Sequence, residues 1–261
     1  MASEEVIRRA ARDITKATRI IAFTGAGISV ESEIAPFRGK SGLWERYNPE
    51  EYAHINTFRK NPEKSWQMLV EMLTFIKKAK PNPAHLALAE LEKLGKLRCI
   101  ITQNVDNLHQ KAGSTSVIDF HGNTRWLVCL ECGRKYKLDE VSLEEIPPRC
   151  ECSAVLKPDA VFFGEPIPKD VLRRSQEEAS KCDLILVIGT SAVIQPAASL
   201  PAIAKRAGAT VIEINPEPAP GAITGIVSDY LIEGKAGEVL PRIVEKIGIS
   251  REIGFLLPMY E

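Results

Sequence analysis

Hydrophobic positions in the first 24 residues change from a helical to a strand-like spacing. Apolar residues first recur three and four positions apart, at Val6, Ile7, Ala10, Ala11 and Ile14. This spacing predicts an amphipathic helix with one apolar face. Residues 19–24 then form a run whose four central positions are all apolar, which is typical of a strand buried on both faces. The chain therefore begins with a predicted helix and a predicted strand.

Short apolar segments and helical patterns alternate through most of the remaining chain. Five further segments are short, apolar and rich in β-branched residues, at 98–102, 117–120, 184–188, 210–214 and 229–232. Helical spacing lies between most of them, at 84–94, 168–181, 197–207 and 236–247. Alternation of near-continuous apolar strands with helices indicates an α/β fold with a doubly wound parallel sheet.

Two stretches interrupt this alternation. The first passes through a loop containing Gly and Pro into a helical segment at 62–79, and the second holds four clustered cysteines among few apolar positions. We therefore expect a Rossmann-like domain with a smaller inserted unit and an apolar tail that packs on its own domain or a neighbouring subunit. The expected ranges are 1–29, 84–121 and 159–248 for the Rossmann-like domain, 30–83 for a cofactor loop and helical insertion, 122–158 for the cysteine-bearing module, and 249–261 for the tail.

Composition narrows the class of protein. Hydrophobic residues make up 44% of the 261 residues and charged residues 26%, as in ordinary globular domains. Basic and acidic residues both number 34, so we expect no direct nucleic acid binding across a basic surface. No apolar run approaches the ~20 residues that span a bilayer, and the acidic start does not resemble a signal peptide. We therefore expect a cytoplasmic protein.

The cysteine pattern predicts a structural zinc site. Cys129 and Cys132 form a C-x-x-C pair, and Cys150 and Cys152 follow in a second, shorter pair. Four thiolates in two tight pairs suit closed tetrahedral zinc, which would make 122–158 a zinc-binding module. A zinc ribbon that binds nucleic acid is an alternative, although the surrounding charges are mixed in sign. The two isolated cysteines, Cys99 and Cys182, fall in or beside apolar runs and fit buried thiols rather than disulfides.

Polar residues follow one buried strand directly. Gln103, Asn104 and Asp106 come immediately after the strand at 98–102 and offer two amides and a carboxylate. Open α/β sheets place ligand chemistry at the carboxyl ends of their strands. The alternative is a polar loop in which Asn104 or Asp106 caps the next helix.

A glycine loop follows the first strand. Gly25-Ala26-Gly27 allows a tight turn and brings backbone N–H groups close to a pyrophosphate. Val30 stands where the dinucleotide fingerprint has its third glycine, which argues against an ordinary hydride-transferring dehydrogenase. Phe37-Arg38-Gly39 lies about a dozen residues further on and could shield a reactive centre and contact phosphate or ribose. Each of these segments alone is also compatible with a turn or a solvated arginine without a ligand.

Other predicted strands also end in small or polar residues. His121-Gly122 follows the strand at 117–120, and a histidine there could act as a general base because its ordinary pKa is near ~6.5. His85 and His109 fit helices and His54 a loop. Three more strand ends carry residues suited to adenosine and ribose: Gly189-Thr190-Ser191, Asn215-Pro216-Glu217 and Lys235-Ala236-Gly237-Glu238. Their convergence on one sheet edge predicts a dinucleotide site.

An ordered set of these motifs resembles the sirtuin family of NAD-dependent protein deacylases. The match runs from about Ile20 to about Glu238. Its elements occur in the family's order: Gly25-Ala26-Gly27-Ile28-Ser29, Phe37-Arg38-Gly39, Gln103-Asn104-Val105-Asp106, His109 with Ala112-Gly113, His121-Gly122, the two cysteine pairs, Val161-Phe162-Phe163-Gly164-Glu165, Gly189-Thr190-Ser191 and Asn215. No single member of the set is specific, but the ordered combination is.

The resemblance implies a role for each motif. His121 would be the general base, and Gln103 and Asn104 would engage the nicotinamide ribose, with Asn104 among the catalytic residues. Asp106 would bind the nicotinamide carboxamide. The pyrophosphate and adenosine half of NAD would be held by Gly25, Ala26, Gly27, Ser29, Phe37, Arg38, Gly189, Thr190, Ser191, Asn215, Glu217 and Ala236.

The resemblance also implies a substrate and a reaction. An acetyl-lysine protein or peptide would bind as an added strand between two segments, Val161 to Glu165 and Ala192-Val193-Ile194. Acyl transfer to ADP-ribose would release free lysine, nicotinamide and O-acetyl-ADP-ribose. An enclosed site would be needed to orient NAD and exclude water, with Phe37 as the shield.

The chain departs from the family's pattern in the cofactor loop. Glu33, Ala35 and Pro36 stand where the family usually has glycine, proline, and aspartate or threonine, so we expect a less well formed loop. In the helical insertion, Trp66 and Leu69 align with the Tyr-x-x-Arg pair of sirtuins that remove acidic acyl groups. We therefore expect a neutral acyl group, acetyl or a longer apolar chain.

Two alternatives to a deacetylase remain at this point. The altered loop could let the ADP-ribosyl centre meet another nucleophile, which would give a mono-ADP-ribosyltransferase. A non-catalytic NAD- or ADP-ribose-binding module, or a zinc-ribbon interaction protein, belongs to a different class. For a protein of that class, the substitution His121→Ala should change no measurable property.

Overall fold

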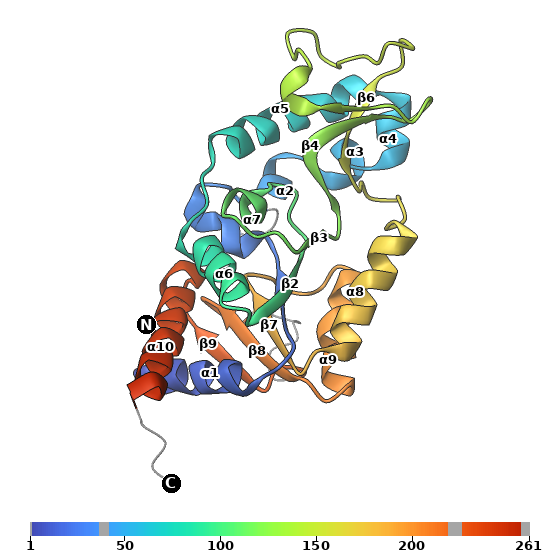
Figure 1. The fold of residues 1–261 in the computed structure, drawn as a ribbon. Coiled ribbons are helices and arrows are strands. Elements are labelled where there is room, and N and C mark those ends of the chain that lie inside the picture. The colour runs from blue at the N-terminus through green and yellow to red at the C-terminus, as the bar shows by residue number, and fades with distance from the viewer. Residues whose placement is uncertain (1, 37–41, 219–225, 257–261) are drawn as a thin grey trace.

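The structure is a computed structural model that describes residues 2–36, 42–218 and 226–256, with side chains up to residue 248. Figure 1 shows that the chain forms two units: a sheet covered by helices, drawn below, and a smaller unit above it. No helix within these ranges is long and apolar enough to span a membrane.

The larger unit is built on a six-stranded parallel sheet. Its strands lie in the order β3 (Val117–Asp119), β2 (Leu97–Thr102), β1 (Ile20–Thr24), β7 (Leu184–Ile188), β8 (Thr210–Asn215) and β9 (Tyr230–Glu233). Every neighbouring pair is parallel. The chain moves outward from β1 to one edge and then returns to build the other, so the strand order reverses between β1 and β7. The expected doubly wound sheet is confirmed, and a ligand crevice is expected outside the carboxyl ends of these two strands.

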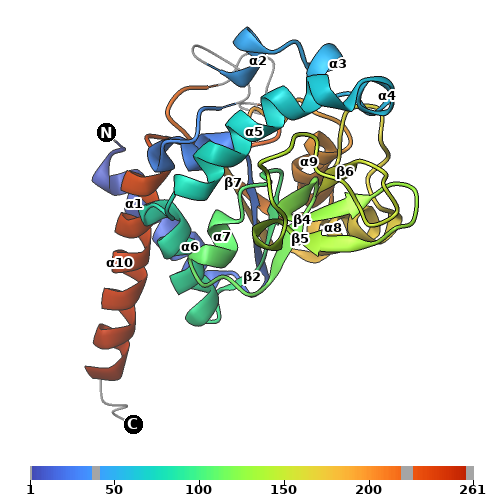
Figure 2. The same cartoon turned by 90° about the horizontal axis from the view of Figure 1, so that it is seen from above.

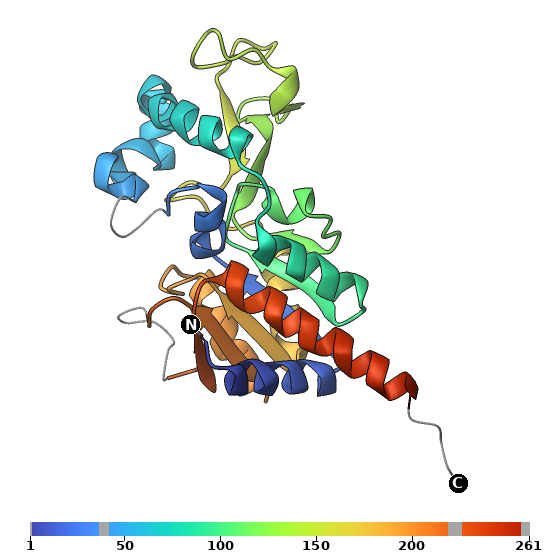
Figure 3. The ribbon, with the colours of Figure 1, turned by 90° about the vertical axis from the view of Figure 1, so that its left-hand side faces the viewer.

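Helices cover both faces of this sheet (Figures 1 and 3). One face packs against α1 (Glu4–Lys16), α6 (Pro83–Lys93) and α10 (Ala236–Leu256). The other packs against α8 (Lys169–Lys181) and α9 (Leu200–Arg206), which follows the short η3 (Ala197–Ser199). Successive residues of β1 alternate between the two cores: Ile20 and Ala22 join the first, whereas Ile21 and Phe23 join the second. This double burial explains why the strand is apolar without interruption.

The smaller unit combines an antiparallel sheet with a group of helices (Figure 2). The sheet has the order β5 (Lys135–Lys137), β4 (Gly122–Cys129) and β6 (Leu156–Ala160). The helices are α2 (Leu43–Arg46), α3 (Pro49–Tyr52), α4 (Ile55–Lys60) and α5 (Pro62–Lys78). Trp66 lies fully buried in their common core, and its indole N–H donates to the Leu156 carbonyl at 2.9 Å.

The sequence predicted the larger unit better than the smaller one. All six strands of the parallel sheet and the long helices lie where their patterns placed them. The patterns gave no strands within 122–158 and no helices between 42 and 60. The helices and β5 are short, and β4 begins with four residues that are polar or glycine, so neither gives a clear periodic signal. Helix α10 also runs to Leu256, well past its predicted end, into the segment expected to be a tail; residues 257–261 lie outside the described part.

Candidate functional site

The glycine loop lies against the loop that follows β7. The Gly25 N–H donates to the Ile188 carbonyl at 3.1 Å, and the Gly27 N–H donates to the Gly189 carbonyl at 2.8 Å. A Cβ atom on Gly27 would lie 2.7 Å from the Gly189 Cα, so only glycine permits this approach of two backbones. The chain then enters η1 (Ala26–Ser32). The loop therefore closes the sheet edge at the point where the strand order reverses.

One donor at this turn remains available for a ligand. The backbone N–H groups of Gly25, Gly27 and Ile28 are all used internally, whereas no partner within the described residues accepts the Ala26 N–H. Ala26 is half-buried and Gly27 is exposed, so the turn is accessible. A free N–H at the start of a helical turn suits an anionic oxygen, and the residues present therefore fit the pyrophosphate of a dinucleotide.

The polar residues after β2 contact this loop directly. The Asn104 amide donates to the Gly25 carbonyl at 3.0 Å and to the Ser29 hydroxyl at 3.1 Å. The Gln103 amide donates to the Thr190 hydroxyl at 2.9 Å, across to the loop after β7. Gln103 remains half-buried, whereas Asn104 is only 5% exposed. The structure thus brings together residues from three strand ends, as the sequence predicted.

Asp106 is buried within this network. It is 4% exposed, and its carboxylate accepts the Ser29 hydroxyl at 2.7 Å and the Leu108 N–H at 2.9 Å. The second contact satisfies the start of α7 (Leu108–Lys111), so the capping interpretation describes part of what Asp106 does. Burial raises the pKa of the Asp106 carboxyl, while the two hydrogen bonds oppose the rise. The carboxyl is thus positioned next to Ser29 at the bottom of the site.

His121 has its tautomer set by a backbone hydrogen bond. Its Nδ1 lies 3.1 Å from the Gln103 carbonyl, which can only accept, so Nδ1 carries the proton of the neutral ring. The lone pair is therefore on Nε2. Burial lowers the pKa of His121, opposed by the hydrogen bond to Gln103, and the ring is neutral near pH 7. These are the properties of a general base.

A pair of histidines, His85 on α6 and His109 on α7, lies beneath the site. His109 on α7 contacts the Thr24 hydroxyl at 2.9 Å through Nε2, and that hydroxyl donates to Thr102 at 2.9 Å. The Thr102 hydroxyl in turn accepts the Asn104 N–H at 3.1 Å. The ring of His85 packs 4.9 Å from that of His109. In the sequence His109 belongs to the ordered motif set, whereas no pattern indicated its contacts with Thr24 and His85.

The ends of β7 and β8 carry the residues predicted for the adenosine half. The Asn215 amide donates to the Thr190 carbonyl at 3.2 Å and to the Glu213 carboxylate at 2.7 Å. Glu213 is fully buried. The Gly237 N–H at the start of α10 donates to the Glu31 carboxylate on η1 at 2.8 Å, which ties that helix to the glycine loop. Asn215 is therefore held rigidly, whereas Glu217 is exposed on the loop beyond it.

The predicted residues of the cofactor loop and of the peptide site have different outcomes. Phe37 and Arg38 lie outside the described residues. Phe162, predicted to contact a peptide, is only 7% exposed and packs edge-on against Phe58 with ring centroids 5.6 Å apart. Its side chain therefore belongs to the core of the smaller unit. Val193 is 43% exposed and remains available.

The cofactor loop contains the backbone strain expected from its sequence. Glu33, where the sequence led us to expect a need for glycine, has φ 63° and ψ 21°. This is the left-handed region, which costs a residue with a Cβ about 1–2 kcal/mol. The loop thus turns immediately after η1, even though Glu33 has a Cβ that disfavours this conformation.

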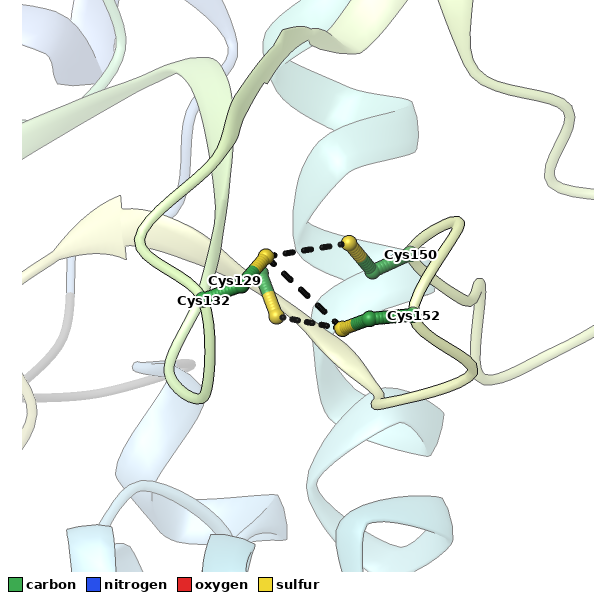
Figure 4. Close-up of side chains that lie close together, drawn as sticks. All are labelled: Cys129, Cys132, Cys150 and Cys152. Atoms are coloured by element: carbon green, nitrogen blue, oxygen red, sulfur yellow. Dashed lines mark hydrogen bonds between the residues drawn. The ribbon is translucent and has the colours of Figure 1, made fainter.

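The four clustered cysteines form a site for one metal ion (Figure 4). Their sulfur atoms lie within 4.8 Å of one another, with Cys129 and Cys152 at 3.5 Å and Cys132 and Cys150 at 3.5 Å. Zinc–thiolate bonds of ~2.3 Å in a tetrahedron place sulfurs about 3.8 Å apart, so the four thiols fit zinc. The Tyr136 hydroxyl lies 3.2 Å from the Cys150 sulfur. Cys99 and Cys182 are buried free thiols, as predicted.

Comparison with known proteins gives consistent results. A family model described as "Sir2 family" matches residues 25–196. The NAD-dependent protein deacylase 2 of Pyrobaculum aerophilum is 51% identical over 228 residues, which cover 87% of this chain and 90% of that protein. A solved Sir2 homolog–NAD complex is similar with a TM-score of 0.85 and 45% identity, covering 95% of this chain and 94% of the other. Sir2Af2 bound to a myristoylated histone peptide is similar with a TM-score of 0.80 and 41% identity, covering 96% and 100%.

Proposed function

Because this chain belongs to the Sir2 family, we infer that it is an NAD-dependent protein lysine deacetylase. It transfers the acyl group of a modified lysine to ADP-ribose and releases nicotinamide and O-acetyl-ADP-ribose. NAD is its co-substrate, and an acetylated protein or peptide is its partner.

One observation carries this proposal. His121, with its lone pair on Nε2, hydrogen-bonds to Gln103, the first residue of the segment whose Asn104 and Asp106 contact the glycine loop. A general base is thus fixed at the edge where a dinucleotide would bind. We assign to His121 the removal of a proton from a ribose hydroxyl of NAD, since its lowered pKa keeps it unprotonated at pH 7.

We propose the following cofactor contacts. The Ala26 N–H and the surrounding glycine turn bind the pyrophosphate, with Arg38 and Phe37 on the loop beyond. Gln103 and Asn104 bind the nicotinamide ribose, and Asp106 accepts from the nicotinamide carboxamide. Asn215, held between Thr190 and Glu213, binds the adenosine half together with Gly189, Thr190, Ser191, Glu217 and Ala236.

The peptide substrate is proposed to bind between two segments. Val161 to Glu165 lies on one side, where the Gly164 N–H makes no hydrogen bond within the described chain. The exposed Val193 lies on the other side. Strand addition through backbone hydrogen bonds would recognise acyl-lysine in many sequence contexts.

A neutral acyl group is the proposed preference. Trp66 is fully buried and its only donor is occupied by the Leu156 carbonyl. Leu69, one turn further along α5, is 1% exposed and offers no charge. Neither residue can pair with an acidic acyl chain, so acetyl or longer apolar chains fit better.

The smaller unit is proposed to serve as a zinc-stabilised support for this site. We propose that it comprises residues 30–83 and 122–158, inserted into a Rossmann-like domain of 1–29, 84–121 and 159–248. A zinc ion bound by four cysteines has no open position, so its function is structural. We further propose a cytoplasmic location, because free thiols and a zinc–thiolate site suit a reducing compartment.

The decisive experiment is incubation with NAD and an acetyl-lysine peptide, followed by mass spectrometry. We expect nicotinamide and O-acetyl-ADP-ribose in equal amounts. His121→Ala should lower turnover by roughly 10²–10⁴-fold, the usual contribution of a general base, while NAD still binds. Arg125→Ala, an exposed change on the strand after His121, serves as the control and should keep full activity. A protein adduct heavier by one ADP-ribose would instead indicate the transferase, and no product from a folded, NAD-binding sample would refute catalysis.

A further inference from the structure

The segment from Val161 to Glu165 is held by a dense set of internal hydrogen bonds. Four of its five N–H groups are already used, by the His121 carbonyl at 2.8 Å, the Glu165 carboxylate at 2.8 Å, the Ala53 carbonyl at 2.9 Å and the Phe162 carbonyl at 3.0 Å. Only the Gly164 N–H has no partner within the described residues. The conformation of this segment thus decides whether that one donor points toward a bound chain.

The segment turns sharply at Gly164. Gly164 has φ +80° and follows Phe163, which pairs with the chain on either side of His54. The Phe163 N–H donates to the Ala53 carbonyl, and the Ile55 N–H at the start of α4 donates to the Phe163 carbonyl. A Cβ on Gly164 would meet the His54 ring at 2.7 Å. The Glu165 N–H closes the turn on the Phe162 carbonyl, as in a turn with glycine at its third position.

A buried lysine lies behind this turn. Lys157 on β6 is 3% exposed, and its ammonium donates to the Ala160 carbonyl at 2.6 Å and to the Glu165 carboxylate at 3.0 Å. The same carboxylate oxygen accepts the Phe162 N–H. The ammonium also lies 4.4 Å from the centre of the Phe162 ring. One cation therefore contacts the strand before the segment, its buried aromatic residue and its last side chain.

Such an arrangement is costly for stability alone. Withdrawing the Lys157 ammonium from water carries a large desolvation penalty, which the partly exposed Glu165 carboxylate only partly offsets, and an apolar residue of similar volume is often as stable. A buried charge that contacts the end of β6 and two side chains of one short segment instead restricts that segment to one conformation. The pair thus contributes more to the geometry of the segment than to the fold.

We propose that Lys157, acting through Glu165, is a positioning residue for the peptide substrate. It fixes the turn at Gly164 so that the free N–H meets the backbone of the acylated chain. This inference rests on the proposed deacetylase function, because it assumes that a peptide binds along this segment. It concerns peptide binding only, since neither residue contacts the glycine loop or the Gln103–Asp106 segment in the described structure.

The test compares kinetic constants of variants of the zinc-loaded, full-length protein. Lys157→Met keeps the length of the side chain and removes its charge. We expect the KM for an acetyl-lysine peptide to rise about tenfold, because small misplacement of a binding group has effects of this order. The KM for NAD should stay within about twofold, and Lys157→Arg should restore most of the peptide KM. Lys135→Met, which removes an exposed ion pair between Lys135 of β5 and Asp159 of β6, should change neither constant.

A second variant keeps the proposal testable if Lys157→Met does not fold. Glu165→Gln retains an oxygen acceptor for the Phe162 N–H but removes the charge, and should raise the peptide KM several-fold with an unchanged NAD KM. A lower melting temperature with an unchanged peptide KM in these variants would overturn the proposal and leave a merely structural ion pair. Equal rises in both KM values would also overturn it. The wild-type reaction separately reports on the proposed function, since an inactive wild type would refute that first.

Discussion

At the scale of single residues, the chemistry depends on backbone groups as much as on side chains. The sequence identified His121 as a base, but its tautomer depends on the carbonyl of Gln103, a group that every residue has. The capping alternative anticipated the contact of Asp106 with the Leu108 N–H, whereas nothing in the sequence paired Asp106 with the Ser29 hydroxyl. Residue types at strand ends were predictable, whereas their hydrogen-bond partners come from loops distant in the chain.

Glu33 gives a prediction about stability at this scale. Its left-handed backbone costs about 1–2 kcal/mol, and glycine would remove this cost while losing part of the gain to its greater freedom in the unfolded chain. Glu33→Gly should therefore raise the free energy of unfolding by roughly 0.5–1 kcal/mol, measured by urea denaturation. Glu33→Ala removes the carboxylate but keeps the Cβ, so it should gain little. Equal stability of the glycine and alanine variants would show that the strain is not significant.

At the scale of elements, the smaller unit depends on its metal site more than on its strands. Strand β5 has three residues, with only Tyr136 partly buried, and β6 reaches β4 through an irregular register. The spacing of the cysteines was enough to predict their site, because four thiolates need few intervening residues. The strands could not be predicted, since β4 begins with polar residues, β5 has only three residues, and metal ligation substitutes for a larger apolar face.

Removal of zinc should therefore unfold this sheet selectively. Treatment with a strong chelator at neutral pH should expose the amides of β4, β5 and β6 to hydrogen exchange, measured by mass spectrometry. Strands β1 and β7 should remain protected, because their cores contain none of the four cysteines. Deacetylation should fall together with β6 protection, since the substrate segment begins directly after that strand.

Cys129→Ser tests the same role without a chelator, and Cys99→Ser is its matched control. The Cys129→Ser variant leaves three thiolates, so zinc content measured by elemental analysis should fall below one ion per chain, with the same local loss of protection. Cys99→Ser, a change to a buried thiol on β2, should keep a full zinc ion. Uniform loss of protection in both sheets after chelation would contradict a local role for the metal.

At the scale of the whole molecule, the order of strands and helices was predictable from local patterns. Alternating apolar strands and amphipathic helices determine a doubly wound sheet, and that sheet brings its carboxyl ends to one edge. Contacts across large sequence separations were not predictable. Two examples are the contacts of Thr24 with His109 and of Lys157 with Glu165. Both depend on tertiary packing, and these residue types occur so widely in the chain that they do not identify their own partners. The sequence thus predicts where the site lies, whereas the contacts among its residues are seen only in the folded chain.

The buried histidines beneath the site make global stability dependent on pH. Burial lowers the pKa of His85 to about 4 and that of His109 to about 3, with the neighbouring His85 adding to the shift of His109. In the unfolded chain both would titrate near ~6.5. Between these values the unfolded chain binds more protons than the folded protein, so stability is fully present above pH 6.5 and is lost as the pH falls.

The expected slope is large enough to measure. Each histidine should remove up to about 1.4 kcal/mol of unfolding free energy per pH unit below pH 6.5. Urea unfolding at pH 7, 6 and 5 should therefore show a falling midpoint, and His85→Gln should make the fall shallower because one proton fewer is taken up on unfolding. Other buried groups also contribute to the slope, because burial raises the pKa of Asp106 and lowers that of His121. They contribute equally to both proteins, so the difference between the two slopes isolates His85. The same slope in the wild type and in His85→Gln would mean that His85 already carries a proton in the folded protein, and the neutral network below Asn104 would then be wrong.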